Sequence, residues 1–177
     1  MKPTTMLRWA IAGLVAAHMP LFAAEKGMAQ SVSVASFQCR QQGNYYTIAI
    51  DQNGKLSDPV IVWTTEEFSG TGYTPERRCR EVTGRLNELL EQNNDSLGGL
   101  YLTAGRVNGQ TVLCSVNNTR YGCNSNNMLF TLSGNNARNP NRVLQSLADD
   151  SQSSGNLIQE SGGQVYVDLE SLVNRLF

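Results

Sequence analysis

Two pairs of adjacent carboxylates are the first candidates for acid–base chemistry in this chain of 177 residues. They are Glu66-Glu67 and Asp149-Asp150. Cleavage of a glycosidic bond requires two carboxyl groups that face each other across the substrate, whereas adjacent side chains tend to point apart. Glu66-Glu67 leads into a loop at residues 68–73, and a solvated loop edge is the favoured interpretation. Glycan cleavage at this pair is kept as an alternative.

A cluster of arginines offers guanidinium groups that could hold an anion. Acidic residues are interleaved with the arginines. The arginines are Arg77, Arg78, Arg80 and Arg85, and the acidic residues are Glu76, Glu81 and Glu88. On a helix, opposite charges three or four residues apart pair with one another. The pattern therefore predicts a salt-bridged outer helix face, and anion binding is the less favoured alternative.

Tyrosines and asparagines offer uncharged groups for recognition. The tyrosines are Tyr45, Tyr73, Tyr101 and Tyr121, and the asparagines form a rich run from Asn117 to Asn141. Tyrosine with asparagine on loops is common at binding surfaces. Asparagine also serves turns that need a positive φ, and this is the favoured interpretation of the run.

Histidine chemistry is excluded from the mature chain. The only histidine, His18, lies in an N-terminal segment that we expect to be removed. No Cys-x-x-Cys pair is present, and the cysteine spacing does not suit a zinc site. We therefore predict no catalytic residue, no cofactor-binding residue and no metal site, and a protein that is not an enzyme.

The cysteines point to disulfide bonds, and four cysteines allow three pairings. All of them lie in the part of the chain that we expect to be exported, where an oxidising compartment favours two bonds: Cys39, Cys79, Cys114 and Cys123. Period-two alternation points Ala35, Phe37 and Cys39 inward from a strand, and Cys79 falls on the apolar stripe of a predicted helix. This geometry favours Cys39 with Cys79, and Cys114 with Cys123 across a short polar loop.

The N-terminus has the layout of a signal peptide. Basic residues precede an apolar stretch from Trp9 to Ala24, which is short for a membrane span, and Gly27-Met28-Ala29 suits a signal peptidase. We predict a signal peptide at residues 1–29 and a single domain at residues 30–177. A cut after Ala24 and an uncleaved membrane anchor are the alternatives.

Composition argues against a nucleic-acid partner. The chain has 14 Lys and Arg against 15 Asp and Glu, for a formal net charge of −1. No basic block is dense enough to bind a phosphate backbone. Apolar residues make up 40% of the chain, which is typical of a globular body.

The elements that would position these residues belong to an α+β fold. Alternation and turn signals predict strands at 35–40, 45–50, 60–63, 100–107, 110–116, 128–132 and 165–167. The apolar run at 60–63 suits a central strand. Thr74-Pro75 starts the principal helix, which should end near residues 92–94, and short helices are predicted after Pro140 and from Leu169. We expect a mainly antiparallel sheet of about six strands with the principal helix packed on one face.

A set of spaced motifs covers most of residues 35–170. They are Phe37-x-Cys39, Pro59-Val60-Ile61-x-Trp63, Pro75-Glu76-Arg77-Arg78-Cys79, Leu102-Thr103-x-Gly105-x-Val107-Asn108-Gly109-Gln110, Cys114, Cys123 and Leu129-Phe130-x-Leu132. With this cysteine order, the chain resembles the circadian oscillating protein family of cyanobacteria. The resemblance implies an exported protein loosely attached to a membrane, whose abundance follows a daily rhythm in some members. It implies no established activity.

These observations predict a non-enzymatic exported module that is peripherally associated with a membrane and binds an envelope protein or a membrane-surface partner. The expected location is a periplasm, a lumen or the extracellular space. The alternative is a histidine-free envelope protein that binds or hydrolyses glycans through Glu66, Glu67 or the tyrosine-bearing loops. No metal, cofactor or nucleic acid is expected.

Overall fold

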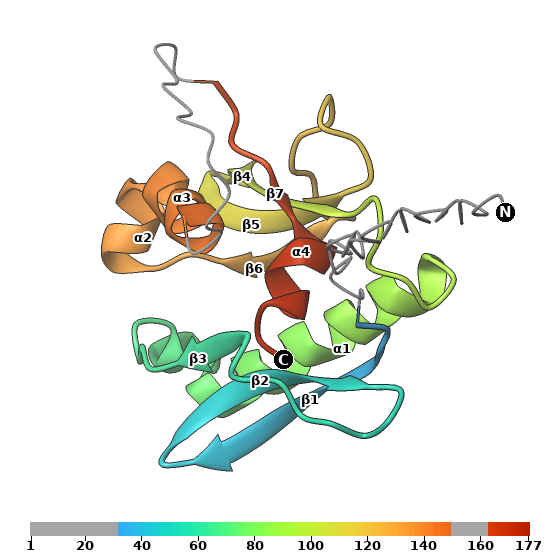
Figure 1. The fold of residues 1–177 in the computed structure, drawn as a ribbon. Coiled ribbons are helices and arrows are strands. Elements are labelled where there is room, and N and C mark those ends of the chain that lie inside the picture. Colours follow the sequence, from blue (N-terminus) through green and yellow to red (C-terminus); the bar gives the residue numbers. More distant parts are fainter. Residues whose placement is uncertain (1–31, 150–162) are drawn as a thin grey trace, which may run out of the picture. The chain divides into compact units, whose positions relative to one another are not determined.

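The strands of the protein form two antiparallel sheets, both of which contact one long helix in the computed structural model (Figure 1). The structure describes residues 32–149 and 163–177, so the predicted signal peptide at residues 1–29 lies outside the described residues. The first sheet has the order β1 (Val34–Gln42), β2 (Asn44–Asp51), β3 (Ile61–Trp63). The second has the order β6 (Met128–Thr131), β5 (Gln110–Val116), β4 (Tyr101–Val107), β7 (Val167–Asp168).

The long helix is α1 (Pro75–Gln92). The shorter helices are η1 (Ser69–Thr71), α2 (Gly134–Arg138), α3 (Pro140–Asp149) and α4 (Leu169–Asn174). The α+β class, the antiparallel strands, the principal helix and the short C-terminal helix are confirmed.

The grouping of the strands differs from the single sheet of about six strands that we expected. Helix α1 packs against β1, β2 and β3 and also against β6, so its buried residues contribute to the packing of both sheets. The prediction that residues 60–63 form a central strand is wrong. Strand β3 is the edge of its sheet, and Val62 is 51% exposed.

Helix α1 begins where its capping residues predict. The Thr74 side chain accepts a hydrogen bond from the Arg77 backbone N–H, and Pro75 occupies the first turn, where no backbone donor is needed. The apolar stripe is buried, as its spacing predicts, and includes Cys79, Val82, Leu86 and Leu90. The helix therefore contributes one face of the core.

A tight turn sets the register of β4 and β5. Asn108 and Gly109 have φ values of 51° and 78°, as a type I′ turn requires, so Val107 pairs with Gln110. The register predicted from the Asn-Gly signal is confirmed along the whole hairpin, from Tyr101 with Val116 to Val107 with Gln110.

The inward orientation that alternation predicts is confirmed for Phe37 but not for Ala35. The pairing of β1 with β2 shifts between Val34 and Ser36, and this irregularity leaves Ala35 exposed. A bulge of this kind breaks the period of two, so the residues before it turn to the opposite faces.

Both predicted disulfides are present. One joins Cys39 of β1 to Cys79 of α1, and the other joins Cys114 of β5 to Cys123, with Cα atoms 5.6 Å apart in each pair. All four cysteines are bonded. Disulfides persist in oxidising compartments, so these bonds indicate a non-cytoplasmic location.

Helix α1 is also fastened to the free edge of the first sheet. The Phe37 backbone N–H donates to Asn87 Oδ1 at 2.7 Å, and Asn87 Nδ2 donates to the Phe37 carbonyl at 3.0 Å. Among the described strands β1 is an edge strand, so these two backbone groups have no strand partner there on that side. The amide of Asn87 takes the place of a strand partner.

No helix within residues 32–149 and 163–177 has the length and hydropathy needed to cross a membrane. The same ranges contain no group of three or more His, Cys, Asp or Glu side chains that could hold a metal ion.

Candidate functional site

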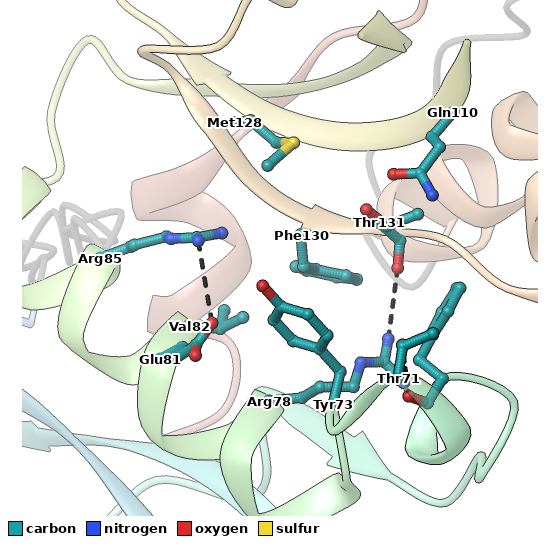
Figure 2. Close-up of a pocket in the computed structure, with 11 residues that line it drawn as sticks. Thr71, Tyr73, Arg78, Glu81, Val82, Arg85, Gln110, Met128, Phe130 and Thr131 are labelled. Atoms are coloured by element: carbon teal, nitrogen blue, oxygen red, sulfur yellow. Dashed lines mark hydrogen bonds and ion pairs between the residues drawn. The ribbon is translucent and has the colours of Figure 1, made fainter. Parts of the chain in front are cut away.

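A cleft of about 230 Å³ opens between α1, the loop that precedes it and strand β6 (Figure 2). Its aromatic walls are Phe68, Tyr73 and Phe130, and its charged side chains are Arg78, Glu81 and Arg85. The charged residues come from one side of α1, because residues three, four and seven apart share a helix face.

The guanidinium of Arg78 lies over two aromatic rings at the wall of this cleft. Its central carbon lies 4.9 Å from the ring centroid of Trp63 and 5.0 Å from that of Phe68, within cation–π distance of both. Nη2 donates a hydrogen bond to the Thr131 carbonyl at 3.2 Å. Only 8% of Arg78 is exposed.

Arg78 lacks the partners that a buried charge usually has. Its Nη1 is buried and has no hydrogen-bond partner in the part of the chain that the structure describes. The ion pairs among those residues involve other arginines. Burial lowers the pKa of the Arg78 guanidinium, and the nearby Glu67 acts in the opposite direction. The side chain is still a cation at neutral pH, because arginine stays protonated in proteins.

The aromatic partners of Arg78 are held in place by contacts of their own. Trp63 Nε1 donates to Thr47 Oγ1 at 3.1 Å, and the Trp63 ring meets Phe130 edge to face at 5.2 Å between centroids. The Phe68 carbonyl accepts a bond from the Tyr73 backbone N–H at 3.1 Å, which closes the loop before α1. Side-chain contacts therefore position the Trp63 ring, and a backbone bond positions the loop that carries Phe68.

Positive charge exceeds negative charge around the cleft. Glu81 accepts a bond from Arg77 Nε at 2.7 Å and lies 3.9 Å from Arg85 Nη2. Arg85 also donates to the Leu129 carbonyl. Among the described residues, the guanidinium groups of Arg78 and Arg85 line the cleft with one carboxylate, that of Glu81, which Arg77 also contacts.

The predicted salt-bridged face of α1 is confirmed for three of the four arginines. Arg77 and Arg85 pair with Glu81, and Arg80 Nη2 lies 2.6 Å from Glu76 Oε1. For Arg78 the prediction is wrong. The rings of Trp63 in β3 and of Phe68 in the loop before α1 cover Arg78. The charge pattern of a helix does not show which other segments will pack over its face.

The carboxylate pair Glu66-Glu67 does not line this cleft. Glu66 accepts a hydrogen bond from the Ser69 hydroxyl and lines a separate pocket together with Glu76, which is paired with Arg80. The side chain of Asp149 and all of Asp150 lie outside the described residues.

The tyrosines that could serve recognition are dispersed. Tyr73 lines the cleft of Figure 2, Tyr121 lines a second cavity and Tyr45 lines the pocket of Glu66. Tyr101 lies in β4. No single aromatic surface unites them.

The asparagine run serves turns, as the favoured interpretation states, but by a different mechanism. Asn118 Oδ1 accepts the Arg120 backbone N–H at 2.9 Å, and Asn124 Oδ1 accepts that of Asn126 at 2.8 Å. Among the described residues, the non-glycine residues with a positive φ are Asn94, Asp95 and Asn108. All three lie outside the run, so a positive φ does not explain its asparagines.

The model of one protein family, described as circadian oscillating protein COP23, matches residues 36–174. The chain belongs to the COP23 family. The resemblance drawn from its motifs is thereby confirmed, and the motif that contains Arg78 lies inside the matched range of this COP23-family chain. The comparisons with curated proteins and with solved structures gave no match. The family description names no reaction or ligand, so function must be inferred from the residues.

The partners of Arg78 in this COP23-family chain were not predicted from the sequence, because they come from β3, the following loop and β6. One usable signal was present. Arg78 precedes Val82 by about one helical turn and Arg85 by about two, which places both arginines beside the apolar stripe.

Proposed function

We propose that the protein is a non-enzymatic exported module that binds a protein partner through the cleft around Arg78 and is held peripherally at a membrane by that partner. One observation carries this function: the guanidinium of Arg78 is buried, and its Nη1 has no partner within the described residues. The aromatic rings around it make the site rigid before any partner arrives.

Arg78 forms no ion pair within the described residues, and burial of a guanidinium in that state costs free energy that a bound carboxylate recovers in part. A carboxylate that reaches Nη1 supplies the missing acceptor and the missing charge together, in a charge-assisted hydrogen bond. Arg85 lies two helical turns further along the same face and adds a second positive charge. An acidic side chain or the C-terminus of a partner protein carries a suitable group.

The aromatic lining favours a protein over an anionic lipid surface. Hot spots of protein interfaces are enriched in Trp, Tyr and Arg, and this cleft combines Arg78 with Phe130 and with Tyr73, which is 43% exposed. Anionic membranes attract clusters of accessible Lys and Arg near their surface. Arg78 is almost fully covered and suits a group that enters a concave site.

The partner is expected in the periplasm, a lumen or the extracellular space. Two disulfides support an oxidising compartment, and the N-terminal sequence has the layout of an export signal.

Mild cross-linking from envelope fractions of the host tests this function. The baits are the tagged, oxidised protein, its Arg78→Met variant and an Arg142→Met control, since Arg142 is exposed and does not line the cleft. Acidic peptides from each captured protein are then titrated, with amidated or Asn/Gln-substituted peptides for comparison. Loss of the charge pair costs about 2 kcal/mol or more, so Arg78→Met should weaken binding about 30-fold.

Equal capture by wild type and Arg78→Met, or equal affinity for acidic and neutral peptides, refutes the proposed function. Vesicles of anionic phospholipid are measured in parallel. Arg78-dependent binding to vesicles without any Arg78-dependent protein refutes the protein partner in favour of a lipid surface.

A second proposal is glycan hydrolysis without histidine. Its support is that Glu66 lines a pocket together with Glu76 and the Tyr45 side chain. Release of reducing sugars from envelope polysaccharide by wild type, and its loss in the Glu66→Gln/Glu67→Gln variant, would establish it. No release by wild type rejects it.

A further inference from the structure

A second cavity, of about 410 Å³, lies at the C-terminal end of α1. It is bounded by that end of the helix, the end of β5 and the loop of residues 117–127 that joins β5 to β6. We call it the amide cavity and define its polar wall by Gln92, Ser115, Asn117, Tyr121 and Asn124.

None of the described side chains that line the amide cavity is charged. Its apolar lining includes Leu89, Leu100 and Val116. Side-chain amides present donors and acceptors together, as hydroxyl groups on a ligand require. An uncharged polar wall beside apolar side chains therefore selects a neutral ligand with hydroxyl or amide groups.

Ser115 supplies a separate indication that a ligand binds here. It lines the amide cavity, is 5% exposed, and its Oγ is buried without a hydrogen-bond partner in residues 32–149 and 163–177. Nearly all buried polar side-chain atoms have a partner, so an orphan hydroxyl calls for an explanation. A turn of the Ser115 side chain toward the cavity would let a ligand hydroxyl provide the missing bond.

The backbone of the loop that carries Tyr121 is held in place, while the aromatic ring of Tyr121 is exposed. The second disulfide anchors the loop at Cys123, and Asn127 Nδ2 donates to the Gly122 carbonyl at 3.0 Å. The Tyr166 hydroxyl donates to the Tyr121 carbonyl at 3.0 Å. Tyr121 itself is 60% exposed. A fixed backbone with an exposed ring reduces the entropy cost of binding.

We propose that the amide cavity binds an uncharged sugar unit of an envelope glycan. The sugar ring stacks its apolar C–H face on Tyr121, and its hydroxyls bond to Asn117 and Ser115. Tyrosine suits this role because it offers an apolar face and a polar tip. The site is separate from the Arg78 cleft, and it does not rest on the function proposed for that cleft.

Nuclear magnetic resonance of the oxidised, ¹⁵N-labelled protein tests this site. The probes are glucose, N-acetylglucosamine and their β-1,4-linked disaccharides at up to about 10 mM, with glucuronic acid as a charged comparison. Binding should shift the side-chain NH₂ resonances of Gln92 and Asn117 saturably. Tyr121→Ala should raise the Kd about 10-fold or more. Tyr73→Ala, the matched control in the other cleft, should leave the Kd unchanged.

Three outcomes overturn the proposal: no neutral probe binds at about 10 mM, Tyr121→Ala binds as tightly as wild type, or glucuronic acid binds more tightly than glucose. Tyr121→Phe keeps the ring and should retain binding. Because Tyr121 is exposed, its variants should fold, and circular dichroism checks that they do. These results are independent of whether Arg78→Met loses a protein partner.

Discussion

Replacement of Arg78 by methionine separates a binding role of the guanidinium from a structural one. Methionine keeps most of the length and the apolar stem of arginine, so it still fills the space between Trp63 and Phe68. Only the charge and the hydrogen bond to Thr131 are removed. We expect the free energy of unfolding of the unliganded protein to change by less than about 1 kcal/mol.

This value follows from opposing contributions. Loss of two cation–π contacts costs about 2 kcal/mol, and loss of a hydrogen bond from a charged donor costs about 1.5 kcal/mol. Removal of a buried, desolvated cation returns several kcal/mol. Burial already lowers the pKa of Arg78, which agrees in direction with a desolvation penalty. Contacts of the methionine sulfur with the rings add about 1 kcal/mol.

Urea denaturation with the disulfides intact, followed by circular dichroism, measures the change. Arg142→Met, an exposed substitution of the same kind, is the control and should stay within about 0.5 kcal/mol of wild type. A loss of more than about 3 kcal/mol in Arg78→Met, with Arg142→Met unchanged, would refute the reasoning. The guanidinium would then be a structural element of the fold.

Three further changes test the packing. Gly105→Ala should destabilise the protein by about 1–3 kcal/mol in the same denaturation experiment, because the new Cβ would lie 2.8 Å from Cys123 Cβ. Gly84→Ala in α1 is the control: its Cβ would meet nothing within 4 Å, and it should stabilise the protein by about 1 kcal/mol. Asn87→Ala loses two hydrogen bonds to β1 and should lower the free energy of unfolding by about 1–2 kcal/mol. The exposed control Glu88→Ala should lower it by less than about 0.5 kcal/mol, and equal losses would contradict a role of Asn87 in fastening the sheet edge. Removal of the disulfide between β1 and α1, with a sequence separation of 40, should lower the free energy of unfolding by about 4 kcal/mol. Removal of the other, with a separation of 9, should lower it by about 2.7 kcal/mol. If calorimetry gave the reverse order, the loop-entropy explanation would be contradicted.

Elements whose signals act over a few residues were predicted correctly. The Thr74-Pro75 start of α1 depends on a side-chain cap within one turn, and the Asn108-Gly109 hairpin depends on two residues that tolerate positive φ. The cysteine pairing also followed from local periodicity, because the inward face of a strand and the apolar face of a helix must meet in one core.

The candidate sites were predicted only in part. Arg78 was recognised as a candidate anion ligand, but it was assigned to a solvated face, and its aromatic partners were not foreseen. Tyr121 and the asparagine run were identified as candidate ligand-binding groups, but nothing in the sequence indicated that Ser115 would line the same cavity. Each site joins segments that are distant in the chain.

Local sequence therefore determined the strands, the helix, the turns and the disulfide partners of this protein. The tertiary structure decided that the strands form two sheets and that Val62 lies on an exposed edge. It also decided that Arg78 and the Ser115 hydroxyl are buried without full hydrogen-bond partners among the described residues. The physical reason is that periodicity and capping describe one segment and its own neighbours. Burial of a charge or a hydroxyl depends on which other segments cover it, and that is settled only when α1 packs against both sheets.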